Sequence, residues 1–117
     1  MLGEHRVAWK HLREALIESV AIGAVPLTLD ALVGVVQQQI DFGQYGSAAE
    51  LLGLALHHPA MEIDVGQLAE LALGRLRKVL PPEQLEAAMN RGKMLKLDAV
   101  VAELEAMPEP GDLTLPQ

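Results

Sequence analysis

Two adjacent histidines, His57 and His58, are the strongest candidates for metal ligands in this chain of 117 residues. Neighbouring positions on a helix point about 100° apart, so two adjacent imidazoles do not easily bind the same metal ion. Both stand directly before Pro59, where a helix is predicted to end. We therefore expect this pair to mark a helix end and to bind no metal.

The other polar pairs fit solvated helix surfaces better than a catalytic centre. His11 and Glu14 are one helical turn apart, and Glu83 and Glu86 share one helix face. The sequence contains no HExxH motif, no GxSxG motif and no glycine-rich phosphate loop. It contains no cysteine, which excludes disulfides and thiolate zinc sites. We expect no enzyme, no metal and no other cofactor. The acidic residues do not have the dense spacing of a calcium loop: Asp30, Asp41 and Asp64.

The charge balance argues against two classes of partner. Nine Lys and Arg face sixteen Asp and Glu, for a net charge of −7. Such a surface repels phosphate backbones, so we expect no direct nucleic-acid partner. No apolar run approaches the ~20 residues that span a membrane, and the first residues lack the apolar stretch of a signal peptide. The expected location is the cytoplasm, without membrane contact.

Apolar residues recur every three or four positions, which predicts an all-α fold of about six helices. Gly23 and Gly43 are predicted to end the first two helices in left-handed caps, and Pro26 and Pro82 suit first helical turns. Gly92 is predicted to cap the fifth. These helices form one domain, residues 1–107, followed by a proline-rich tail, 108–117, that we expect to be disordered. The predicted helices cover residues 7–22, 28–41, 47–58, 64–80, 82–91 and 97–107.

The sequence also matches itself. Residues 3–16 align with residues 43–56 without a gap, which indicates an internal repeat. A helical hairpin without repeats remains the alternative, because its apolar residues would also recur at three and four. The aligned pairs are Gly3 with Gly43, Ala8 with Ala48, Leu12 with Leu52, Ala15 with Ala55 and Leu16 with Leu56.

The spacing within residues 32–59 resembles the tetratricopeptide repeat. Leu32 is followed at the family's intervals by Val35-Val36 and Gln39, and Ala48 is followed four positions later by Leu52. The family places aromatic residues at positions where this chain has Leu32, Gln39 and Leu52, and Pro59 comes one residue early. The resemblance implies an array of helical hairpins, in which Leu32, Val35 and Leu52 fill the seam between paired helices. Ala48 and Ala55 would let those helices approach closely.

A broader resemblance covers residues 5–107. The stretches "HLREALIES", "SAAELLGLALHHP" and "LDAVVAEL" are similar to the carboxyl end of the repeat region in large bacterial signalling ATPases, including LuxR-type transcriptional regulators. This resemblance implies an interaction or regulatory role and carries over no catalytic residue.

In tetratricopeptide arrays the first helix of each pair lines a concave surface. The resemblance therefore implies a groove that binds a protein or peptide. The alternative is that the glutamines 37–39 merely cover a solvent-facing surface. The groove residues implied are Asp30, Val33, Gln37, Ile40 and Asp41.

The self-match places Gly3 in a turn, so the first helix of the opening repeat would be missing. Ala8, Trp9 and Leu12 would then lie near an open end, where a second copy could pack in a two-fold dimer. The leading interpretation is a non-catalytic interaction module of tetratricopeptide type in a bacterial signalling or transcription-regulatory protein. A small self-associating helical protein is the alternative, and a helix-turn-helix DNA binder is a third reading that the acidic charge disfavours.

Overall fold

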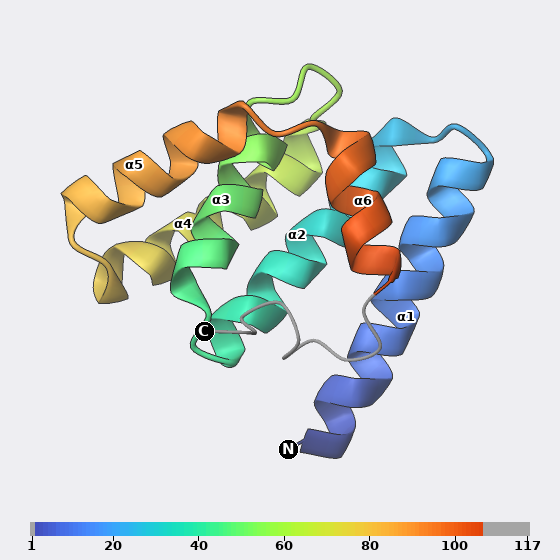
Figure 1. Cartoon of the computed structure of the whole chain (residues 1–117), viewed down its shortest axis with the longest axis horizontal. Coiled ribbons are helices and arrows are strands. Elements are labelled where there is room, and N and C mark those ends of the chain that lie inside the picture. Colours follow the sequence, from blue (N-terminus) through green and yellow to red (C-terminus); the bar gives the residue numbers. More distant parts are fainter. Residues whose placement is uncertain (1, 107–117) are drawn as a thin grey trace.

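The computed structural model describes residues 2–106 of the chain, and the side chains from residue 7 onward. This part of the chain forms six α-helices (Figure 1). The all-α class predicted from the periodicity is confirmed. The helices are α1 (Leu2–Ala21), α2 (Val25–Asp41), α3 (Tyr45–Leu56), α4 (Ile63–Val79), α5 (Pro82–Lys93) and α6 (Leu97–Glu105).

The first two helix ends are built by glycine. Gly23 and Gly43 have φ angles of +70° and +79°, a conformation that a residue with a Cβ rarely adopts. After α1, the N–H of Ala24 donates to the carbonyl of Ser19 at 2.8 Å, and after α2 the N–H of Gln44 donates to the carbonyl of Gln39, also at 2.8 Å. These are the six-to-one bonds of the Schellman motif. These two glycine helix ends are confirmed, and so is the proline in the first turn of α2 and of α5.

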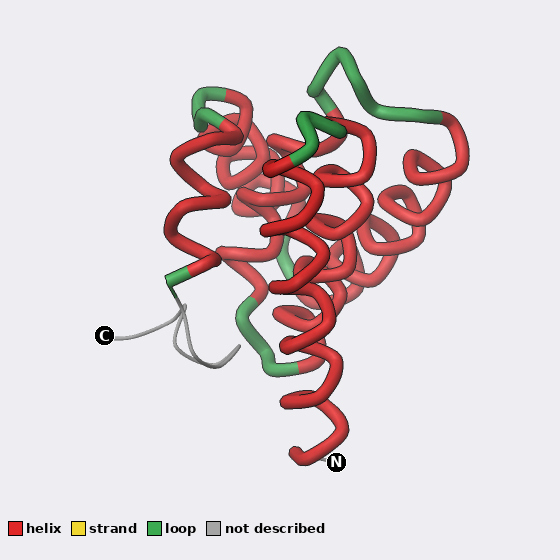
Figure 2. Tube along the Cα trace, turned by 90° about the vertical axis from the view of Figure 1, so that its right-hand side faces the viewer, coloured by secondary structure: helices red, strands yellow, loops and turns green. Residues whose placement is uncertain are grey.

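The helices pack around α2. Helix α1 lies along one side of α2, α3 lies along another, and α4 contacts both α2 and α3. Helix α5 packs on α3, and α6 returns to α1 at the opposite end of the molecule (Figures 1 and 2). Helix α1 therefore contacts both α2, the next helix in the chain, and α6, the last one described.

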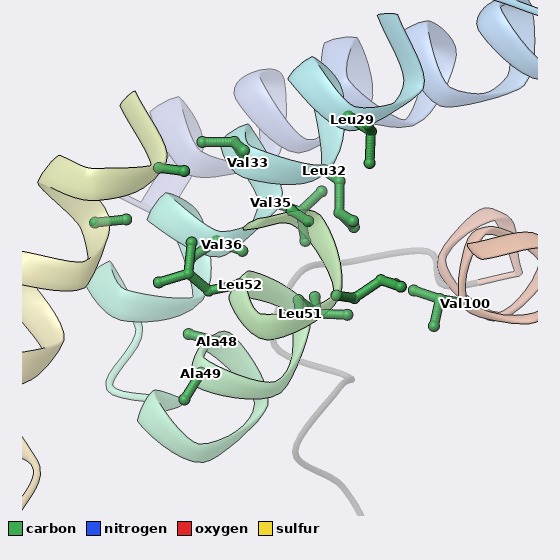
Figure 3. Close-up of a cluster of buried hydrophobic side chains, with 14 of the residues drawn as sticks. Leu29, Leu32, Val33, Val35, Val36, Ala48, Ala49, Leu51, Leu52 and Val100 are labelled. Carbon is green, nitrogen blue, oxygen red and sulfur yellow. The ribbon is translucent and has the colours of Figure 1, made fainter. Parts of the chain in front are cut away.

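The core is mostly aliphatic, with Trp9 as its buried aromatic residue, and many of its side chains lie at the α2–α3 seam (Figure 3). Leu32, Val35 and Leu52 are fully buried there, as predicted. Ala48 and Ala55 are also fully buried, so the small residues of α3 lie at a close helix contact. Val100 brings α6 into the same cluster.

Two local expectations are wrong. Gly3 lies within α1 and forms no turn, because α1 begins at Leu2, well before residue 7. The match of Gly3 to Gly43 is therefore not a match of structure. Gly92 lies inside α5 and does not cap it; its lack of a side chain serves a tight contact with the carbonyl of Glu50. The predicted tail, 108–117, lies outside the described residues.

No helix within residues 2–106 has the length and hydropathy needed to cross a membrane.

Candidate interaction groove

Helices α1, α2 and α4 enclose a surface groove of about 420 Å³. Helix α2 lines it with Asp30, Val33 and Gln37. Helix α1 forms one wall with Leu12 and Ala15, and α4 contributes Leu68 from the other side. The groove therefore depends on three segments that are separated in sequence.

The floor is closed by a glycine contact. A Cβ added to Gly34 would lie only 2.5 Å from the Cδ2 atom of Leu12. Gly34 therefore lets the Leu12 side chain of α1 lie directly on the backbone of α2.

Two hydroxyls hold the turn end of the groove. Ser19 Oγ lies 2.7 Å from Thr28 Oγ1 and 3.0 Å from the carbonyl oxygen of Leu16, while Thr28 Oγ1 lies 3.3 Å from the carbonyl oxygen of Ala24. Each hydroxyl has one proton, and the two shortest contacts are satisfied if Thr28 donates to Ser19 and Ser19 donates to Leu16. Both side chains are buried. This pair ties the carboxyl end of α1 to the start of α2.

The α4 wall is joined to α2 by Arg75. Its Nη1 donates to Gln37 Oε1 and its Nη2 donates to Asp41 Oδ1, both at 2.5 Å. The side chains of Arg75 and Asp41 are 42% and 40% exposed, so this ion pair adds little to the free energy of unfolding. It links α4 to two residues of α2, Gln37 and Asp41.

The rim of the groove carries exposed apolar side chains. Ile22 is 72% exposed, Leu27 is 55% exposed and Leu68 is 47% exposed. Two carboxylates, Glu18 and Asp30, line the same groove, and neither is paired with another described residue. The groove is thus apolar with an acidic edge.

Three of the five residues predicted for a groove line this one, and two do not. Asp30, Val33 and Gln37 line the groove, although Val33 is only 2% exposed. Ile40 does not line this groove; it is 6% exposed and packs in the core. Asp41 does not line it either, and its carboxylate pairs with Arg75 of α4.

The predicted self-association patch needs a larger correction. Trp9 is 2% exposed and lies in the core of its own chain, so it presents no apolar surface to a second copy. Helix α6 also packs on α1 near this residue: Arg13, one helical turn from Trp9, donates its Nε proton to the carbonyl of Glu105 at 2.6 Å. Ala8 is half-buried, and Leu12 lines the groove.

The contributions of α1 and α4 to the groove were not predicted. Ile22 and Leu27 lie on either side of the turn that connects α1 to α2, and Leu68 lies in α4. Only their exposure in the folded chain distinguishes them from core residues.

The two histidines face different local partners. His57 Nδ1 donates to the carbonyl of Gly53 at 2.9 Å, and His58 Nδ1 accepts the N–H of Ala60 at 3.1 Å. Among the described residues, no group of three or more His, Asp or Glu side chains is arranged to hold a metal ion.

Comparisons with protein-family models, with curated proteins and with solved structures found no match for this chain.

Proposed function

We propose that this chain is a non-catalytic protein-interaction module of tetratricopeptide type, and that the α1–α2–α4 groove binds an apolar helix of a partner protein. The observation that carries the proposal is the cluster of exposed apolar side chains on the groove rim: Ile22, Leu27 and Leu68. Exposed apolar groups gathered around a concave surface are typical of helix-in-groove recognition. The resemblance in sequence supports placing the module in a bacterial signalling or transcription-regulatory protein.

The charge of the groove selects the partner. Glu18 and Asp30 lie at the edge of an apolar floor, and the whole chain carries a net charge of −7. A partner helix with an apolar face and flanking Lys or Arg residues complements both features. An acidic partner helix would be repelled.

The affinity should be modest. The groove has a volume of about 420 Å³, and association costs translational and side-chain freedom before any contact is gained. A micromolar dissociation constant is the expected range for a single shallow groove.

The test uses two amphipathic helical peptides with the same leucine face, one flanked by lysines and one by glutamates. Fluorescence anisotropy with labelled peptide measures the dissociation constants. We expect the lysine-flanked peptide to bind and the glutamate-flanked peptide to bind at least about tenfold more weakly, because like charges oppose each other at the rim.

A matched pair of variants locates the site. Leu68→Glu places a charge in the groove, whereas Ile63→Glu changes an 80% exposed residue of the same helix that does not line the groove. Leu68→Glu should abolish binding and Ile63→Glu should leave it unchanged. Equal effects of the two variants, or no preference for the basic peptide, would refute the proposal. Sedimentation of the unmodified chain over a concentration series tests the self-associating alternative directly.

A further inference from the structure

A second pocket, of about 540 Å³, lies between α4 and α5 and does not share any residue with the groove. It exists because these two consecutive helices diverge. They contact each other little, whereas α5 packs closely on α3. The connection at Leu80 and Pro82 closes one end of the pocket.

Two glycines allow α5 to pack closely on α3, away from α4. A Cβ on Gly53 would lie 2.8 Å from the Cα atom of Met89, and a Cβ on Gly92 would lie 2.8 Å from the carbonyl carbon of Glu50. Both contacts are with backbone atoms of the facing helix, so α3 and α5 approach as closely as two helices can. Helix α5 therefore packs on α3, and the space between α5 and α4 stays open as the pocket.

The interior of this pocket is aliphatic. Leu73 and Leu80 enter it from α4 and its end, and Leu85 and Met89 enter it from α5. The volume lies within the range of about 300–1,000 Å³ that is usual for small-molecule sites. Leucine and methionine side chains without an aromatic ring suit a flexible aliphatic chain.

The rim of the pocket carries two cations that have no partner among the described residues. Arg77 and Lys93 line it, and neither forms an ion pair or hydrogen bond with another described residue. The nearby arginines differ in this respect, because Arg75 binds Asp41 and Arg91 binds Glu50. A locally basic rim is unusual on a chain with a net charge of −7.

Two further polar groups complete the rim. His57 donates its Nδ1 proton to the carbonyl of Gly53, so its Nε2 atom is left to face other groups. Among the described residues, Glu86 is the one carboxylate that lines the pocket, together with Arg77 and Lys93.

We infer that this pocket binds a small aliphatic molecule with one anionic group, such as a fatty carboxylate. The tail would occupy the space between α4 and α5, and the carboxylate would bind at the rim that Arg77 and Lys93 line. Burial of the tail supplies affinity, and the charge-assisted hydrogen bonds supply selection for an anion. The inference does not depend on the proposed groove, because the two sites have no residue in common.

Octanoate is the test ligand, and 1-octanol is the control ligand with the same tail and no charge. Spectra of the chain labelled with ¹³C at the methionine methyl groups report the site directly. Met89 lines the pocket, and Met61 lies outside it. We expect octanoate to shift the Met89 signal saturably and to leave Met61 unmoved.

Adjacent residues of α4 provide the matched variants. Arg77→Glu changes the rim, and Lys78→Glu makes a similar charge reversal at an exposed position outside the pocket. Arg77→Glu should weaken octanoate binding by roughly fivefold or more, while Lys78→Glu should keep the affinity of the unmodified chain. Both variants should keep the melting temperature, because both side chains are exposed.

Three results would overturn the inference. They are the absence of a saturable Met89 shift, equal loss of affinity in the two variants, and binding of 1-octanol as tight as that of octanoate. The last result would mean an apolar cavity that does not select an anion. Leu68→Glu in the groove should leave octanoate binding unchanged, which separates this site from the proposed protein-binding function.

Discussion

Replacing Gly53 with alanine should destabilise this chain, although the same replacement in the interior of a helix usually stabilises it. Alanine is favoured over glycine in a helix by about 1 kcal/mol. At Gly53 the new methyl group would lie 2.8 Å from the Cα atom of Met89 and closer still to the carbonyl oxygen of that residue. Backbone atoms of a packed helix cannot rotate away, so α5 must move.

The magnitude follows from these two opposing effects. Overpacking of a close contact costs about 1–3 kcal/mol, and a clash with backbone belongs at the upper end of that range. After the gain in helix propensity is subtracted, Gly53→Ala should lower the free energy of unfolding by about 1–2 kcal/mol.

The chain provides its own control. Gly74 lies inside α4, and a Cβ built on it meets no atom within 4 Å. Gly74→Ala should therefore raise the free energy of unfolding by about 0.5–1 kcal/mol. The two variants should differ by about 1.5–3 kcal/mol, which is roughly 6–12 °C in melting temperature for a domain of this size.

Thermal and urea unfolding followed by far-ultraviolet circular dichroism would measure both values. If Gly53→Ala proved as stable as Gly74→Ala, the close contact of α3 with α5 would be wrong. Close packing of α5 on α3 could then no longer explain why the pocket between α4 and α5 is open.

Three further substitutions test other parts of the packing. Trp9→Ala should cost about 3–5 kcal/mol in urea unfolding, because the indole is 2% exposed in the core; a loss below about 1 kcal/mol would place Trp9 at the surface. Ala48→Leu and Ala55→Leu should each cost about 1–3 kcal/mol, whereas Ala15→Leu on the exposed side of α1 should be almost neutral in the same melting experiment. Arg75→Gln should lower the free energy of unfolding by no more than about 1 kcal/mol, and a larger loss would show that the α2–α4 ion pair is less exposed than its geometry indicates.

The sequence determined the features that depend on neighbouring residues. The helical class follows from apolar residues three and four apart, and the first two helix ends follow from Gly23 and Gly43, whose positive φ angles suit glycine. The burial of Leu32, Val35 and Leu52 could be predicted for the same reason, because each lies on the apolar stripe of its own helix.

The candidate groove was only partly predictable. Asp30, Val33 and Gln37 line it as expected, since they share one face of α2. Ile40 and Asp41 lie near that face but do not line the groove. Ile40 packs in the core, and Asp41 forms an ion pair with Arg75 of α4. A helical periodicity indicates which residues point in one direction, and it does not indicate which other helix will cover them.

The tertiary structure alone decided the contacts between distant segments. The sequence predicted Trp9 near an open end, but Trp9 is buried in the core, in a helix that packs against α2 and against α6 from the far end of the chain. The sequence predicted Gly92 as a helix cap, but Gly92 instead contacts the backbone of Glu50 where α5 packs on α3. In both cases the partner lies many residues away, and the burial it provides exists only once the helices have packed.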